Sequence, residues 1–342
     1  MPSVVDPLPL TPPRFRLVRF LARGGFSAVY LALDEELNRV VVVKAMRGKH
    51  AHRRWARDHL LFEAEVTARL EHPGVLPVYS RGIDKAGHAY FTMRFVRGEP
   101  LSRAIAGLHA SDGPRPRRRV LTRLVDRLVD VCYTVDFAHR RGVAHRDLTP
   151  ANVMLGEHGE TLLLDWGLAK LIPPTSPAEE LSTGRADELA LPELRPRRAQ
   201  EEDSDEDDGA GTEYGVSLGT PRYMSPEQAA GEWDEFGPAS DVFSLGATLY
   251  ELLTGRAPFD DDDRDRSEAL ARRGVFAAPR EVDRRVPAAL ESVCLKAMMR
   301  RPSERYPDPI AFGSDLARWV AGQPVSVSRV PTLRDWKKQL LD

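Results

Sequence analysis

The chain has few cysteines, and this limits the kinds of fold and site that it can contain. Only two are present in 342 residues, Cys132 and Cys294, and both lie within apolar stretches. Two cysteines cannot form a disulfide-rich scaffold or a four-cysteine metal site. We therefore expect both thiols to be small buried side chains rather than reactive groups.

A large charge of one sign and long apolar runs are also missing. The 49 basic residues nearly balance the 51 acidic residues, which argues against a general nucleic-acid-coating function. No apolar run approaches the roughly 18–20 residues that span a bilayer. Residues 1–13 have neither the basic segment nor the apolar core of a secretory signal. These absences predict a reducing, cytoplasmic compartment, unless the chain is part of a membrane-anchored protein that continues beyond Asp342.

The charge that is present is unevenly distributed. Residues 171–216 contain 13 acidic and four basic residues, including the run EEDSDEDD at 201–208. Such a run repels itself and cannot bury apolar area. We therefore expect residues 173–215 to form a disordered insertion. It is either a passively tolerated surface segment or a regulatory one, and both interpretations stay open.

The apolar pattern divides the chain into a strand-rich part and a helix-rich part. The first part gives four signals: strands within 15–44, a helix at 53–70, and strands around 75–79 and 89–95. After Gly98 the pattern becomes helical, with a long apolar helix face at 121–135. The basic stretch at 113–119 is expected to be a loop that is either solvated or binds phosphate. The overall pattern predicts an α+β protein with two lobes.

The first chemical signal is a turn of small residues between two expected strands. It comprises Leu21, Ala22, Arg23, Gly24, Gly25, Phe26, Ser27, Ala28 and Val29. Small residues allow backbone N–H groups to approach a phosphate chain, although a tight hairpin would use the same residues. Lys44 closes the next apolar strand, where a buried ammonium needs an anion. Glu63 on the following helix is the candidate partner, since Glu65 points about 200° around the helix.

Two polar loops further along the chain give the second signal. The loop HRDLTPAN at 145–152 follows the long helix. Asp147 can accept a proton, and the amide oxygen of Asn152 can bind a hard cation. A short strand then ends at Asp165, with a glycine two residues later. A carboxylate in that position is suited to hold Mg²⁺.

The order and spacing of these motifs resemble the eukaryotic-type Ser/Thr protein kinases of bacteria. The resemblance extends from about Phe15 to Val320. It includes the turn at 21–29 and the loop at 145–152. It also includes VVVK at 41–44, DWG at 165–167, GTPRYM at 219–224, SPE at 225–227, DVFSLG at 241–246 and the late Arg305. In this family such an arginine pairs with the glutamate of the SPE segment, here Glu227.

The resemblance implies a bilobal protein-kinase-like fold of the α+β class. A small β-rich N-lobe would occupy residues 15–96, and a larger helical C-lobe would occupy residues 97–322. An extended leader at 1–14 would precede the two lobes, and a tail at 323–342 would follow them.

The resemblance also implies roles for the site residues. Lys44, oriented by Glu63, would hold the α- and β-phosphates of ATP beneath the turn at 21–29. Asp147 would orient and deprotonate the substrate hydroxyl, while Asn152 and Asp165 would bind Mg²⁺.

The adenine ring of ATP would lie at the end of the N-lobe. Met93 would sit behind the ring as a gatekeeper residue. The backbone groups of Arg94, Phe95 and Val96 would form hydrogen bonds with the base.

Four positions depart from the family pattern. Ala22 and Ser27 replace two glycines of the turn, and both are small enough to preserve nucleotide binding. Trp166 replaces a phenylalanine, which changes packing only. Thr149 stands where these kinases usually carry a catalytic lysine that helps to neutralise the γ-phosphate, so transfer is expected to be slower.

The sequence therefore predicts an ATP- and Mg²⁺-dependent kinase that phosphorylates Ser and Thr residues of proteins, including itself. Its partners would be protein substrates and a second copy for autophosphorylation, with no nucleic acid and no membrane span in this chain. The alternative is a pseudokinase or weakly active nucleotide-binding scaffold, which Ala22, Ser27 and Thr149 favour. A small-molecule kinase explains less, because residues 219–227 and 241–246 resemble peptide-docking elements.

Activation of such a kinase commonly depends on a phosphorylated residue in the segment before GTPRYM. Arg146 and Lys170 resemble the basic pocket that receives this phosphate. Thr212 and Ser217 are the candidate acceptors. The alternative is a segment that is ordered without phosphate, with acidic side chains supplying the anion.

Overall fold

The computed structural model describes residues 14–48, 53–110, 114–172, 219–232 and 235–327. They form two units. The first contains the described residues up to Arg97 together with Asp165–Gly167, and the second contains the other described residues from Gly98 onward. The acidic insertion and both candidate phosphoacceptors lie outside the described residues, as do nearly all of the leader and most of the tail.

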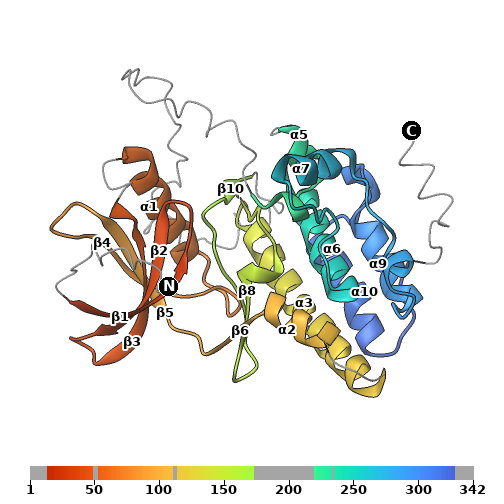
Figure 1. Ribbon diagram of the computed structural model, residues 1–342, viewed down its shortest axis with the longest axis horizontal. Coiled ribbons are helices and arrows are strands. Elements are labelled where there is room, and N and C mark those ends of the chain that lie inside the picture. Colours follow the sequence, from red (N-terminus) through yellow and green to blue (C-terminus); the bar gives the residue numbers. More distant parts are fainter. Residues whose placement is uncertain (1–13, 49–52, 111–113, 173–218, 233–234, 328–342) are drawn as a thin grey trace, which may run out of the picture. The chain divides into compact units, whose positions relative to one another are not determined.

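The first unit is an antiparallel sheet with one helix (Figure 1). Its elements are β1 (Phe15–Arg23), β2 (Ser27–Asp34), β3 (Arg39–Met46), α1 (Arg54–Arg69), β4 (Val78–Ile83) and β5 (Ala89–Arg94). The strands lie in the order β1-β2-β3-β5-β4. The strand expected around residues 75–79 begins at Val78, because Pro77 has no N–H group for a sheet hydrogen bond.

The valine-rich β3 lies at the centre of this sheet and is buried on both faces. Val41 and Val43 pack with Phe15 of β1 and with Ala32 and Ala45, none of them more than 6% exposed. On the other face, Met46 of β3 lies in a buried cluster with Leu60 of α1, so the helix covers this side of the sheet. β-branched side chains fit such a doubly covered strand, which explains the valines at 41–43, whereas Val40 at the start of the strand is 49% exposed. The sheet therefore fixes Lys44 at the buried end of β3.

The second unit is mainly helical. Its strands and 3₁₀ turns are β6 (Gly98–Pro100), β7 (Val143–Ala144), η2 (Pro150–Asn152), β8 (Val153–Gly156), β9 (Thr161–Leu163), β10 (Lys170–Leu171), η4 (Pro221–Tyr223) and η5 (Pro302–Glu304). Its helices are α2 (Leu101–Ala110), α3 (Pro114–Arg140), α5 (Pro226–Ala230), α6 (Pro238–Thr254), α7 (Arg264–Arg273), α8 (Pro279–Val282), α9 (Ala288–Ala297) and α10 (Pro309–Val320).

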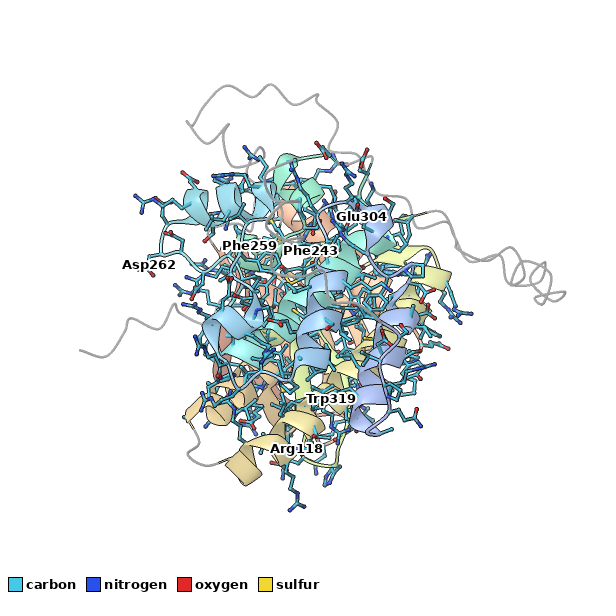
Figure 2. The ribbon with its side chains drawn as sticks, turned by 90° about the vertical axis from the view of Figure 1, so that its right-hand side faces the viewer. Arg118, Phe243, Phe259, Asp262, Glu304 and Trp319 are labelled. Carbon is cyan, nitrogen blue, oxygen red and sulfur yellow. The ribbon has the colours of Figure 1, made fainter. Side chains whose placement is uncertain are left out.

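Helix α6 forms the centre of the second unit and is buried over almost its whole length. Phe243 of this helix stacks on Phe259, with the ring centroids 6.2 Å apart, in the interior of the unit (Figure 2). Cys132 and Cys294 are fully buried in the surrounding helices, as the sequence predicts. Burial raises the pKa of both thiols, so neither is a reactive thiolate at neutral pH.

The basic stretch expected to be a loop is helical. Residues 114–119 form the first turns of α3. Two prolines near a helix start are tolerated, because the first N–H groups have no intrahelical acceptor, and arginine is a good helix former. Among the described residues, no helix is both long enough and apolar enough to cross a membrane.

Candidate active site

A buried lysine between two carboxylates forms the core of the site in the first unit. The Nζ atom of Lys44 lies 2.6 Å from Oε1 of Glu63 and 3.3 Å from Oδ1 of Asp165. Glu63 lies on the face of α1 that packs on the sheet, and Glu65 instead pairs with Arg69 on the same helix. The partner inferred from helical spacing is therefore the observed one.

The burial of this ion pair changes the proton affinity of both partners. Burial raises the pKa of Glu63 to about 7, because desolvation of the carboxylate outweighs its attraction to the Lys44 ammonium. Burial alone would lower the pKa of Lys44, but the two carboxylates outweigh it and raise that pKa. The lysine is thus held as a cation, whereas Glu63 exchanges a proton close to neutral pH.

Asp165 differs from Glu63 in exposure and backbone geometry. Its side chain is 49% exposed, and its backbone φ of 59° lies in the left-handed region. The backbone N–H of Gly167 donates to its Oδ1 atom at 3.3 Å. A Cβ atom on Gly167 would lie only 3.0 Å from that oxygen, so glycine permits the close approach. The carboxylate is left with an accessible face.

The turn of small residues connects β1 and β2. Leu21, Ala22 and Arg23 end β1, Gly24, Gly25 and Phe26 form the turn, and Ser27, Ala28 and Val29 begin β2. The N–H of Gly24 donates to the Ser27 carbonyl at 2.9 Å. Phe26 packs edge-to-face on His59 of α1, with ring centroids 5.0 Å apart, so an aromatic contact ties the turn to the helix that carries Glu63.

The residues expected to contact adenine lie at the end of the sheet. Met93 of β5 is partly buried and packs against the cluster between β3 and α1. The N–H of Arg94 donates to the Pro77 carbonyl at 3.1 Å, so the sheet already uses that amide. Phe95 and Val96 follow β5 and are partly buried.

The second unit supplies a loop that holds Asp147. The amide nitrogen of Asn152 donates to Oδ2 of Asp147 at 3.0 Å and to its carbonyl at 2.8 Å. The backbone N–H of Thr220 donates to Oδ1 at 3.0 Å. Both carboxylate oxygens of Asp147 are therefore fixed by donors.

A buried aspartate of α6 anchors the start of this loop. Asp241 accepts hydrogen bonds from the backbone N–H groups of His145 and Arg146, at 2.8 and 2.9 Å, and from Nε2 of His139 at 2.7 Å. Burial opposes ionisation of Asp241, but these donors outweigh it and keep its pKa below the usual range. The anchor holds Arg146 at φ 73°, a left-handed conformation that is uncommon for such a residue.

Thr149 lies within the loop and carries no charge. It is 4% exposed, and its carbonyl accepts from the N–H of Asn152 at 3.0 Å in the turn η2. Thr149 therefore brings no cation to this loop.

The segment from Gly219 to Glu227 is fixed to the helical unit by its side chains. Glu227 forms a double hydrogen bond with Arg305, at 2.7 and 2.8 Å, which is the pair inferred from the sequence. The Tyr223 hydroxyl donates to Glu251 of α6. Sequence reasoning missed Glu251 and also Gln228, whose Nε2 atom donates to the Arg146 carbonyl at 2.9 Å. No spacing rule connects residues 82 positions apart, so the sequence contains no signal for the Gln228 contact.

Most of the chain matches a known protein family. The model of the protein kinase domain matches residues 15–194 and 197–307. The serine/threonine-protein kinase PknD of Protochlamydia amoebophila is 31% identical over 328 residues, which cover 92% of this chain and 31% of that protein. PknB of Mycobacterium leprae is 32% identical over 340 residues, covering 95% of this chain and 46% of that protein. The chain thus spans about a third to a half of the length of these relatives.

A solved structure matches the fold. The crystal structure of the Mycobacterium tuberculosis PknI kinase domain aligns with a TM-score of 0.60 and 22% identity, covering 90% of this chain and 97% of that one. This likeness confirms the α+β protein-kinase-like fold predicted from the motifs. The family match and the sequence identities confirm the resemblance itself, and the chain belongs to the protein kinase domain family.

Proposed function

We propose that this chain transfers the γ-phosphoryl group of ATP to Ser and Thr hydroxyls of proteins, itself included. The observation that carries the proposal is the fixed carboxylate of Asp147, which receives one hydrogen bond from Asn152 and one from Thr220. An aspartate held in this way is suited to orient a hydroxyl and accept its proton. The proposal requires the groups of both units to act on the same ATP molecule.

In the first unit, Lys44 is assigned to the α- and β-phosphates of ATP. Its ammonium is already held in place by Glu63, so the lysine is pre-organised for the phosphates. The turn from Leu21 to Val29 is assigned to the phosphate chain, with Ala22 and Ser27 small enough to permit a close approach. Met93 and the backbone of Arg94, Phe95 and Val96 are assigned to the adenine ring. Arg94 then contributes only its carbonyl, because its N–H donates to the Pro77 carbonyl.

Asn152 and Asp165 are assigned to Mg²⁺. Their chemistry fits a hard cation, because one offers a half-exposed carboxylate and the other an amide oxygen. The amide nitrogen of Asn152 is used by Asp147, which leaves the oxygen of the same amide for the ion. The described residues contain no cluster of three or more His, Cys, Asp or Glu side chains suited to a metal. Bound Mg²⁺ would supply charge neutralisation at the phosphates.

The reaction follows from these assignments. The substrate hydroxyl loses its proton to Asp147, its oxygen forms a bond to the γ-phosphorus, and the bond to the β-phosphate oxygen breaks to leave ADP. Lys44 stabilises the negative charge of the phosphates. Catalysis by this chain therefore depends on positioning and charge rather than on a covalent intermediate.

The second candidate function is a weakly active nucleotide-binding scaffold. The buried, uncharged Thr149 favours it, because the loop lacks the cation that the family places beside the γ-phosphate. This scaffold would bind ATP through Lys44 and transfer its phosphate slowly.

The proposal is tested by incubating the purified chain with Mg²⁺ and ATP labelled at the γ-phosphate. Wild type should label itself and an added protein on Ser and Thr, whereas Lys44→Met should not. Lys85→Met, which replaces an exposed lysine of the turn before β5, is the matched control and should behave as wild type. Binding of ATP without labelling would favour the scaffold, and no binding would refute both functions.

A further inference from the structure

Two cations of the helical unit lie against the same aromatic ring. The Cζ atom of Arg146 is 5.0 Å from the centroid of Phe236, and Nζ of Lys170 is 5.7 Å from the same centroid. The β7–β10 pair brings the two cations together, because Lys170 lies opposite Ala144, two residues before Arg146. Phe236 comes from a different part of the chain, immediately before the residue that precedes α6.

The contact between the cations and the ring lies in a buried part of the helical unit, where electrostatic interactions are stronger than in water. Phe236 is 4% exposed, and burial lowers the pKa of the Arg146 guanidinium. Two neighbouring cations repel each other, and the repulsion grows as water is removed. The face of an aromatic ring carries negative potential and attracts cations within about 6 Å of its centroid. The ring of Phe236 thus offsets the repulsion between Arg146 and Lys170.

The backbone of Arg146 transmits this contact to Asp147. Its N–H donates to Asp241 at 2.9 Å, and its carbonyl accepts from Gln228 at 2.9 Å. Its left-handed backbone conformation persists only while the surrounding contacts hold it. A guanidinium that left the ring would pull on this backbone, and the next residue is Asp147 itself.

We propose that Phe236 is a positioning residue for phosphoryl transfer. Its ring holds Arg146 and Lys170 together and thereby holds the loop in the conformation that presents Asp147 to the substrate. The inference rests on the proposed function. It also changes the expectation for activation: Arg146 and Lys170 are the cations assigned from the sequence to an activating phosphate. With the ring in place, the loop keeps its conformation without that phosphate.

The main variants of the test change the electrostatics of the Phe236 ring and leave its shape intact. Phe236 is replaced by phenylalanines with one, two and three ring fluorines, which weaken the negative face of the ring. Phe236→Leu removes the ring, and Phe236→Tyr keeps it. The same fluorinated series at Phe276 is the matched control, because this buried ring packs edge-to-face on the rings of Tyr250 and Phe259. All samples are treated with a protein phosphatase, and mass spectrometry verifies that no phosphate remains.

We expect phosphatase-treated wild type to transfer phosphate. The kcat should fall stepwise with each fluorine at position 236 and should fall about tenfold in Phe236→Leu, or about 1.4 kcal/mol of barrier. The KM for ATP should stay within about twofold of wild type, because the lysine of the phosphate site is unchanged. Phe236→Tyr should retain most of the wild-type kcat, and the series at Phe276 should leave kcat unchanged.

Two results would overturn the inference and leave the proposed function standing. One is a fluorinated series at 236 with the same kcat as wild type. The other is wild type that transfers phosphate only while it is itself phosphorylated. If Phe236→Leu does not fold, the fluorinated series decides, since it preserves the packing. A wild type that is inactive in every phosphorylation state would instead refute the proposed function.

Discussion

The Glu227–Arg305 pair gives a prediction about the stability of the helical unit. The Arg305 side chain is completely buried, and Glu227 accepts from it at 2.7 and 2.8 Å. Burial opposes ionisation of Glu227, but the guanidinium outweighs burial and holds the pKa of this carboxyl below its usual range. The substitution Glu227→Gln preserves the shape of the side chain and removes its charge.

The expected loss can be worked out from the contacts that remain. Removing one partner of a buried ion pair costs about 3–5 kcal/mol, because it leaves a buried charge without a counterion. Arg305 also donates to the carbonyls of Met299, Ala239 and Arg300, at 2.8–2.9 Å. These neutral acceptors keep part of its hydrogen bonding, so we expect about 3 kcal/mol. Losses of this size lower the Tm of a unit of this length by about 6–12 °C.

The assay is urea unfolding at pH 7 of wild type, Glu227→Gln, Arg305→Met and the double variant. The double variant should lose less than the sum of the single variants, with a coupling energy of about 2 kcal/mol. The exposed pair Arg103–Glu99, whose side chains are 79% and 47% exposed, is the control, and Glu99→Gln should cost less than about 0.5 kcal/mol. Additive losses, or a loss below about 1 kcal/mol for Glu227→Gln, would refute the reasoning.

Three further predictions concern the site and the insertion. Because burial raises the pKa of Glu63 to about 7, its carboxylate becomes protonated as the pH falls below 7. The kcat/KM for ATP should therefore decrease toward acidic pH, with an apparent pKa near 7. Stability changes in the opposite sense: the folded state holds the proton more tightly than the unfolded chain, so this group's contribution to unfolding free energy decreases as the pH rises from about 4.5 to 7. Thr149→Lys should raise kcat with little change in ATP affinity if the missing cation limits transfer, and an unchanged rate would show that another group already neutralises the charge. Deleting residues 175–211 should raise activity toward an added substrate at low salt, and the gain should shrink at high salt; no effect at either salt would favour a passive insertion.

Much of the site could be predicted from the sequence because its signals are local. Lys44 directly follows a run of valines, and helical spacing selects Glu63 over Glu65. The loop from His145 to Asn152 and the aspartate at 165 stand directly after regular elements. In each case the chemistry follows from a residue and its immediate neighbours.

The contacts that the sequence could not predict join distant parts of the chain. Phe236 meets Arg146 across 90 positions, and Gln228 meets the same residue across 82. Neither contact has a periodic pattern, since both depend on how α5 and α6 pack against the loop. The basic stretch at the start of α3 shows a local failure, because it was expected to be a loop although a helix tolerates prolines in its first turn.

The central claim is that Asp147 takes the proton of the substrate hydroxyl. The most direct test measures the initial rate of γ-phosphoryl transfer, and the affinity for ATP, in Asp147→Asn and in Asp126→Asn, which changes an exposed aspartate of α3. We expect Asp147→Asn to lose about 10²–10⁴ in transfer rate at unchanged ATP affinity, and Asp126→Asn to match wild type. Transfer by Asp147→Asn at the wild-type rate would contradict the account.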